Sequence, residues 1–346
     1  MMLSADILLS VIIPYYKGAA FIEDLIESIE GLNPDIIHQM EVLIVDDGSP
    51  VSSQFNLDRC FKEKAFVSVF HKEHRGIADT RNYGLKKSRG QFITFCDQDD
   101  LCLVGYSRFI RLIENNIADL LMANYATKTQ EGNSHSNSLL SNDAILCGSL
   151  CKEMVRRHLG GGTTNEIPEF YPTIWNCIFR KLFLDQNEIT FSRFVDYEDD
   201  WLFILDSLLA ANRVMLTSQY WYQHCERNDS ESHVRKYIPD YYKKRKALRH
   251  YLESVSTEAS LTSQEQKNSL SFFDAQTVIG GFYNCAPCPF PLYSKEMSSF
   301  SFSIVDYFRL RSYFRPKKLR LLAIALCSRF WIVTRSVFLI KSKRHY

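Results

Sequence analysis

Three clusters of acidic residues could do chemistry in this chain of 346 residues. The first is Asp97-Gln98-Asp99-Asp100, which directly follows an apolar run that is typical of a buried strand. Alternate residues of an extended segment point the same way, so Asp97 and Asp99 could converge on one cation. Carboxylate oxygens suit Mg²⁺ or Mn²⁺, and such an ion can bind a substrate diphosphate. A solvated turn or a helix N-cap is the competing interpretation of so short a motif.

The other two clusters also have a structural alternative. Asp46-Asp47-Gly48-Ser49 ends a second apolar run, and its carboxylates can accept hydrogen bonds from a uracil ring or a ribose. An Asp-Gly turn without a ligand is the alternative. Nearby, Arg75 and Arg81 could offset the charge of a nucleotide. The third cluster, Glu198-Asp199-Asp200, opens an apolar helical pattern, where an acid either serves as a general base for a hydroxyl or only complements the helix dipole.

The elements that must position these clusters alternate along the first hundred residues. Apolar runs typical of buried strands occur at 8–14, 41–45, 67–70 and 92–96, and helical patterns at 20–29 and 77–87. Strands that alternate with helices indicate an α/β fold with a mostly parallel sheet flanked by helices. Such sheets bind ligands beyond the carboxyl ends of their strands. The first two acidic clusters are therefore expected at the ligand-binding edge.

The remainder of the chain has weaker patterns. A strand is expected at 119–124, a polar mobile loop at 127–143, helices at 145–158, 174–183 and 199–209, and a strand at 214–216. From about residue 237 the pattern becomes mainly helical. This change predicts a larger domain over residues 1–235 and a mainly helical C-terminal region over residues 236–346.

Composition and charge exclude several classes of protein. With 46% apolar and 23% charged residues, the chain can bury a core and is not an extended disordered protein. The N-terminal residues show no basic segment ahead of a long apolar stretch, which predicts no signal peptide. The ten irregularly spaced cysteines are then expected to be reduced thiols of a cytoplasmic protein.

The net charge of +1 conceals an asymmetry along the chain. No acidic residue follows Asp306, and 11 of the 41 basic residues do, which leaves 30 basic against 40 acidic residues before that point. An acidic body with a basic tail indicates two different environments. Nucleic acid is not an expected partner, because the aromatic and glycine features of such sites are missing.

The apolar stretch at residues 321–340 has two interpretations. It contains Arg329 and Arg335, and each arginine at a bilayer centre costs roughly 2.5–3.5 kcal/mol, so a spanning helix is not expected. The first interpretation is a peripheral helix on an anionic membrane surface, supported by the basic tail, at the cytoplasmic face of the cell membrane. The second is a helix that packs on the rest of the chain or in a homo-oligomer.

Five segments, taken in order, resemble the family 2 glycosyltransferases, which have the GT-A fold. The segments are residues 10–16, 45–49, 76–85 and 90–100, and a fifth from Trp175-Asn176 through Phe179-Arg180-Lys181 to Glu198-Asp199. The resemblance covers roughly residues 8–232. It implies a GT-A (Rossmann-like) domain over residues 1–235. It also implies a hexosyltransferase-type enzyme that moves a sugar from a nucleotide diphosphate donor, expected to be a UDP-sugar, to a hydroxyl of a surface glycan or glycolipid.

The resemblance also implies which residues bind the nucleotide sugar. Pro14 and Tyr16 would line the nucleotide site. Asp47, with Asp46 beside it, would contact the base or the ribose. Arg81 would lie near the base and the diphosphate.

Four acidic residues would act at the reacting end of the donor. Asp97 would approach the ribose and sugar, and Asp99 would be the main protein ligand of the Mn²⁺ or Mg²⁺ cofactor. Asp199 would be the catalytic base, with Glu198 supporting it or sharing the acceptor site. Members of the family are expected to invert the anomeric configuration in one displacement.

The sequence departs from the family pattern at several positions near the base. Lys17 stands where many members have Asn, Thr80 replaces a common Ala, and His74-Arg75 replaces a more usual Asn-containing pair. These departures leave the donor nucleotide open. A loop after the aromatic strand would either close over the diphosphate or be a surface loop; it contains His224, Arg227, Ser230 and Ser232.

Two other functions remain as alternatives. A nucleotidyltransferase can share the fold and an Asp-x-Asp metal site, but it would not need Glu198-Asp199. A catalytically inactive, membrane-associated assembly partner is disfavoured, because every carboxylate that the chemistry needs is present.

Overall fold

The computed structural model describes residues 7–31, 37–103, 112, 118–129, 131–137, 142–159, 173–191, 199–227, 237–314 and 317–342. The chain divides into two compact units. The sheet unit comprises residues 1–155 and 164–228, and the helical unit comprises residues 156–163 and 229–346. The predicted domain organisation, with its boundary near residue 235, stays a prediction.

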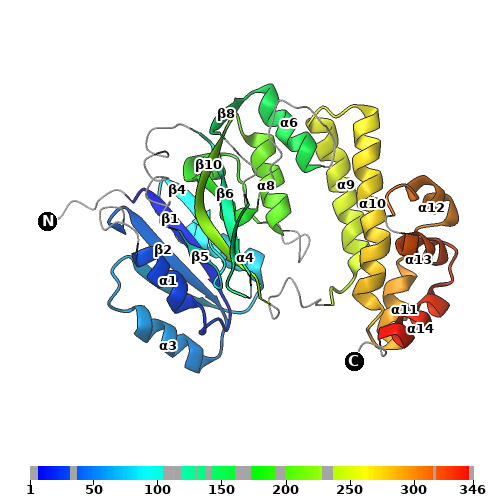
Figure 1. The fold of residues 1–346 in the computed structure, drawn as a ribbon, viewed down its shortest axis with the longest axis horizontal. Helices are drawn as coiled ribbons and strands as arrows, with labels where there is room; N and C mark the ends of the chain where they lie inside the picture. The colour runs from blue at the N-terminus through cyan, green and yellow to red at the C-terminus, as the bar shows by residue number, and fades with distance from the viewer. Residues whose placement is uncertain are drawn as a thin grey trace. The chain divides into compact units, whose positions relative to one another are not determined.

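The sheet unit is built around one mixed sheet of ten strands in the described residues (Figure 1). Its main path is β3 (Val67–Lys72), β2 (Met40–Asp47), β1 (Leu9–Tyr15), β4 (Phe92–Phe95), β9 (Cys177–Arg180), β6 (Leu120–Lys128), β10 (Arg213–Cys225) and β5 (Leu101–Cys102). Off this path, β7 (Ser134–Asn137) pairs with β6, and β8 (Ala144–Cys147) pairs with β10. β1, β2, β3, β4, β6 and β10 run in one direction, and the others run opposite. The predicted α/β fold with a mostly parallel sheet is confirmed.

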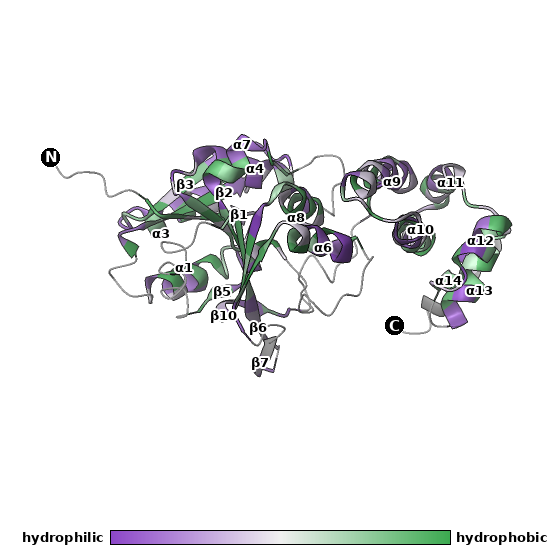
Figure 2. Ribbon diagram, turned by 90° about the horizontal axis from the view of Figure 1, so that it is seen from above, coloured by the Kyte–Doolittle hydropathy of each residue, from purple (hydrophilic) through white to green (hydrophobic). Residues whose placement is uncertain are grey.

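Helices cover both faces of the N-terminal strands. The helices described in this unit are α1 (Ile22–Glu30), α3 (Val51–Phe61), α4 (Ile77–Lys87), α6 (Ser149–His158), α7 (Lys181–Gln186) and α8 (Asp199–Ala210), of which α6 ends in the helical unit. The buried side of α1 shares a core with Val11 and Ile13 of β1. Ile12 points to the other face, where a Cβ at Gly84 of α4 would lie 2.4 Å from the Ile12 Cγ2 atom. Figure 2 shows α1 and α4 on opposite sides of the sheet.

Several local predictions are wrong, and the reason is tertiary. The helix predicted over 174–183 is a 3₁₀ turn (Ile174–Asn176), then β9, then α7. β9 pairs with both β4 and β6, so its apolar residues are buried in the middle of the sheet and do not form one face of a helix. The polar loop predicted over 127–143 is partly a hairpin, because β7 pairs with the end of β6. The helix predicted over 145–158 begins only after β8.

The helical unit is built on a pair of long helices. α9 (Tyr241–Glu258) and α10 (Ser263–Cys285) lie side by side (Figure 1). In the part of this region that the structure describes, the shorter helices α11 (Phe290–Ser298), α12 (Ile304–Leu310), α13 (Lys317–Cys327) and α14 (Trp331–Ser342) follow them. The mainly helical C-terminal region predicted from the sequence is confirmed.

The apolar tail is two helices and not one. The break lies at Arg329, whose φ of 65° falls in the left-handed region that side chains other than glycine rarely adopt. The Arg329 guanidinium donates a hydrogen bond to the Phe300 carbonyl at 2.8 Å, and that of Arg335 donates to the carbonyls of Ala286 and Cys288. Both arginines thus bind within this unit. Among the described residues, no helix is long and apolar enough to cross a membrane.

Candidate active site

The acidic segment after β4 is tied to β10 through Asp100, which is 2% exposed. Its carboxylate accepts hydrogen bonds from the Tyr222 hydroxyl at 2.6 Å and from the Cys225 backbone N–H at 2.7 Å, and His224 Nδ1 lies 3.2 Å away. The ring of Trp175 stacks on Tyr222 and on His224, with centroid distances of 4.6 and 5.8 Å. Asp100 therefore has a positioning role, which the sequence did not single out.

Asp97 and Asp99 have fewer partners and an unfavourable electrostatic environment. Burial raises the pKa of Asp97 to about 7; Arg81 opposes this shift, and the charges of Asp100, Asp200 and Asp99 add to it. Burial and Asp100 also raise the pKa of Asp99. The ionised forms of both groups thus need more positive charge than the described side chains supply.

Asp97 and Asp99 would each supply carboxylate oxygens to a cation that a substrate also binds. Among the described residues, no three His, Cys, Asp or Glu side chains form a group that could hold a metal ion by themselves. Mg²⁺ commonly binds through one or two protein carboxylates together with substrate phosphates, so a larger group is not required. The donor set Asp97 and Asp99 has the oxygen chemistry that Mg²⁺ and Mn²⁺ prefer.

Arg81 of α4 brings the first and third acidic clusters together. Its guanidinium is 2% exposed and lies 3.2 Å from Asp97, 3.1 Å from Asp199, and within hydrogen-bond distance of Asp200. The sequence predicts that Arg81 contacts a nucleotide, and the structure places it among three carboxylates. Because these residues come from the ends of β4 and α8, one buried arginine fixes the distance between the two acidic clusters.

Asp199 and Asp200 differ in their access to solvent. The side chain of Asp199 is 7% exposed, whereas that of Asp200 is 40% exposed. Although part of the carboxyl is exposed, desolvation of the remainder and the charge of Asp199 raise the pKa of Asp200 to about 6, and Arg81 opposes the shift. A raised pKa and an accessible carboxylate suit a proton acceptor, so the geometry favours Asp200 over the predicted Asp199. Glu198 lies outside the described residues.

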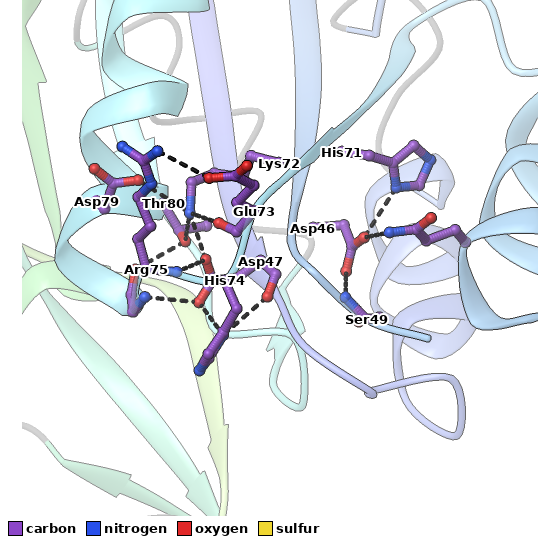
Figure 3. Close-up of polar contacts among 12 residues, drawn as sticks. Asp46, Asp47, Ser49, His71, Lys72, Glu73, His74, Arg75, Asp79 and Thr80 are labelled. Carbon is purple, nitrogen blue, oxygen red and sulfur yellow. Dashed lines mark hydrogen bonds and ion pairs between the residues drawn. The ribbon is translucent and has the colours of Figure 1, made fainter. Parts of the chain in front are cut away.

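The second acidic cluster, Asp46-Asp47, is paired with other groups of the protein. Asp46 is completely buried and accepts hydrogen bonds from the Ser49 backbone N–H and the Gln54 amide, both at 3.0 Å. His71 Nδ1 lies 2.9 Å from the same carboxylate (Figure 3). Burial opposes the charged form of His71, but its contacts with Asp46 and Asp58 outweigh that effect and raise its pKa. These contacts favour a positioning role for Asp46.

The carboxylate of Asp47 binds the segment that follows β3. It accepts hydrogen bonds from the backbone N–H groups of Arg75 and Gly76, each at 2.9 Å, and from the Lys72 ammonium (Figure 3). Lys72 lies 3.0 Å from Asp79 as well and is largely buried. Burial favours the neutral form of Asp47, but the hydrogen bonds from Lys72, Arg75 and Gly76 lower its pKa below the usual value.

Two glycines allow this close approach. Gly48 and Gly76 have φ of 75° and 91°, which glycine adopts without strain. A Cβ at Gly48 would also lie 2.7 Å from the His74 backbone nitrogen. The turn after β2 can therefore lie directly against the segment after β3.

The loop after β1 joins the first two acidic clusters. The Tyr16 backbone N–H donates to the Gln98 side chain at 3.0 Å, and the Lys17 N–H donates to the Ser49 hydroxyl at 3.0 Å. Lys17 has a φ of 55°, a conformation that Asn tolerates better than Lys. Pro14 is buried in β1, opposite Val45 of β2.

Most sequence-predicted site residues therefore fall into two networks at one edge of the sheet. The loop after β10 reaches the same edge, because Arg227 donates to the Asp99 carbonyl at 2.7 Å. Ser230 and Ser232 lie outside the described residues. Lys72 and Tyr222 were not predicted as site residues, although each lies at or near the end of a strand at the predicted edge.

Comparison with known proteins identifies the family. The model of glycosyl transferase family 2 matches residues 10–182, which is half of the chain. The chain belongs to glycosyl transferase family 2. This membership confirms the resemblance seen in the sequence and supports glycosyltransferase activity.

Relatives and solved structures agree with this family 2 assignment. The uncharacterized glycosyltransferase EpsJ of Bacillus subtilis is 24% identical over 228 residues, or 66% of this chain and 63% of EpsJ. The minor teichoic acid biosynthesis protein GgaB of the same organism is 33% identical over 99 residues, or 28% of this chain and 11% of GgaB. The crystal structure of S. aureus TarS 1–349 in complex with UDP-GlcNAc has a TM-score of 0.62 at 19% identity, covering 96% of this chain and 92% of that one. The last similarity confirms the GT-A-like fold.

Proposed function

We propose that this family 2 member transfers a sugar from a UDP-sugar to a hydroxyl of a surface glycan or glycolipid. The observation that supports this function best is the Arg81 network, which holds Asp97 beside Asp199 and Asp200. The transfer needs carboxylates on the donor side and on the acceptor side of the site. In this protein the Arg81 guanidinium contacts Asp97 as well as Asp199 and Asp200. The TarS complex with UDP-GlcNAc and the teichoic acid protein GgaB support a nucleotide-sugar donor and a surface-polymer acceptor.

The acceptor hydroxyl must lose a proton as it attacks the anomeric carbon. We assign that proton to Asp200, with Asp199 as the alternative, because the Asp200 side chain is far more exposed. A single displacement inverts the configuration, so an α-linked donor gives a β-linked product.

The leaving diphosphate carries the charge that develops in the reaction. Asp99, assisted by Asp97, would hold a Mn²⁺ or Mg²⁺ ion, which when bound neutralises that charge. Tyr16 and the segment held by Asp47 would lie on the nucleotide side of the site, and Pro14 would contribute its backbone there.

We also propose that the helical unit associates with an anionic membrane surface at the cytoplasmic face. Lys317, Lys318 and Leu321 are exposed, and the two lysines lie four and three positions before Leu321 on α13. The double variant Lys317→Glu/Lys318→Glu should sediment less with anionic liposomes at low salt. Unchanged sedimentation would instead favour the interpretation in which the tail only packs on protein.

A donor screen tests the transfer itself. UDP-sugars would be incubated with the protein and a glycolipid acceptor, with and without Mn²⁺, while UDP release and labelled product are measured. Asp200→Asn is the matched control for non-enzymatic release. Release of pyrophosphate would indicate a nucleotidyltransferase, and nucleotide binding without any transfer would indicate an inactive assembly partner.

A further inference from the structure

Of the two described side chains that contact the Asp47 carboxylate, Lys72 is largely buried and His74 is 60% exposed. Its ring stacks on Tyr16 with a centroid distance of 4.8 Å and an interplanar angle of 25°. Its Nδ1 atom lies 2.9 Å from the Asp47 carbonyl oxygen and 2.8 Å from the Asp47 carboxylate. The His74 side chain is thus held in place by the stacking of its ring on Tyr16 and by the contacts of its Nδ1 atom with Asp47.

These contacts determine which nitrogen of His74 carries the proton. Both oxygens near Nδ1 are acceptors, since the Asp47 carboxyl has a lowered pKa and is ionised. Nδ1 must therefore donate a hydrogen, and in the neutral imidazole Nε2 is left as an acceptor. Figure 3 shows this second nitrogen directed away from Asp47 and from the other labelled residues.

The Asp47 carboxylate has little capacity left for a ligand. It already accepts from Lys72 and from the N–H groups of Arg75 and Gly76, and it contacts His74 Nδ1. An ionised carboxylate has about four acceptor sites, and these four contacts use them. A base that enters this part of the site meets the outer edge of His74 before it meets Asp47.

On the basis of the nucleotide-sugar donor proposed above, we propose that His74 determines which base the donor carries. Its Nε2 atom accepts the ring N–H of a uracil that lies in the plane of the imidazole ring. Cytosine has the same size but an unprotonated ring nitrogen at that position. Two lone pairs would then face each other, so cytosine is rejected.

The test compares UDP with CDP, which differ in the base edge that His74 would contact. Calorimetric titration in the presence of MnCl₂ should give the wild-type chain a preference for UDP of about tenfold or more, because cytosine leaves the His74 acceptor without a hydrogen. His74→Phe keeps an aromatic ring on Tyr16 but removes the acceptor. Its UDP affinity should fall to nearly the CDP level, while its CDP affinity stays close to that of the wild type.

Glu73→Ala provides the matched control, because its side chain is exposed and pairs only with Arg75 among the contacts of the described residues. It should keep the UDP preference. His74→Ala carries the same test if the Phe variant does not fold, and the same loss of preference is expected. A UDP preference in either His74 variant as large as that of the wild type would overturn the role of His74 and leave the donor function intact. No binding of either nucleotide to the wild-type chain would overturn both.

Discussion

Asp47 at the end of β2 and Asp97 after β4 are both carboxylates, but their pKa values are shifted in opposite directions. The Asp47 carboxylate accepts hydrogen bonds from two backbone N–H groups and from the Lys72 ammonium, and its pKa is lowered. Asp97 has one guanidinium contact and several acidic neighbours, and its pKa is raised to about 7. Both lie at the edge where parallel strands end, so position alone does not separate them.

The opposite pKa shifts indicate that the Asp46-Asp47 cluster stabilises the structure of the site and that the Asp97–Asp100 cluster binds a ligand. A carboxylate whose acceptor sites are filled by the protein stabilises the loops that donate to it. A carboxylate whose charge is insufficiently compensated gains most when a cation or a proton arrives. We therefore expect substitutions at the β2 end to reduce stability and substitutions at the β4 and α8 ends to reduce activity.

The largest effect is expected at the start of α8. Asp200→Asn keeps the size of the side chain but removes its ability to take a proton, so transfer should fall by about 10²–10⁴-fold. UDP and metal binding should persist, and Asp199→Asn should have a smaller effect. A larger loss in the Asp199 variant, measured in the same transfer assay, would return the role of base to Asp199.

The next effect concerns stability at the β2 end. Lys72→Met removes the buried ammonium that Asp47 and Asp79 share, and breaking such a pair costs about 3–5 kcal/mol. The free energy of unfolding should be measured by urea denaturation. Lys62→Met, at an exposed lysine just after α3, should change it by less than about 0.5 kcal/mol. Equal stability of the two variants would remove the scaffold role of the β2 cluster.

A third substitution tests ligand binding by the Asp97–Asp100 cluster. Asp99→Ala should remain folded, because its carboxylate is insufficiently compensated in the free protein. Mn²⁺-dependent UDP affinity should fall by more than the roughly 10–100-fold that is typical of residues behind a metal ligand. Wild-type affinity in this variant, measured by calorimetry, would contradict the assignment of Asp99 as the main ligand.

The smallest expected effect is a pH dependence of the rate. The pKa of Asp200 is raised to about 6, so the ionised base predominates above that pH and is lost as the pH falls through it. The value of kcat/KM should fall about tenfold per pH unit below about 6, provided that the protein remains folded. A profile that is flat down to pH 4.5 would show that Asp200 is not the base.

The parallel part of the sheet could be predicted because strands buried on both faces have continuous apolar sequences, as in β1 and β2. β9 has the same character, but its short run lies next to helix-forming residues and was predicted as part of a helix. Only its position between β4 and β6 distinguishes the two structures.

The sequence predicted the types of residue in the site, but it did not predict which of these residues contact one another. Arg81 and Asp199 are 118 positions apart, and no local pattern indicates that they pair. The filling of the Asp46 and Asp47 acceptor sites likewise depends on His71 and Lys72 of the neighbouring strand β3. Such contacts arise from strand order, which the spacing of acidic residues does not contain.

The stacking of Trp175 on Tyr222 and His224 also gives the protein an intrinsic optical probe. The indole lies against two rings of β10 that contact Asp100 directly, within the acidic segment that follows β4. Indole emission responds to nearby charge and to quenching by imidazole, so a ligand that rearranges this segment should change the fluorescence of Trp175. Binding could then be followed in real time without an attached dye, after replacement of the other three tryptophans by phenylalanine.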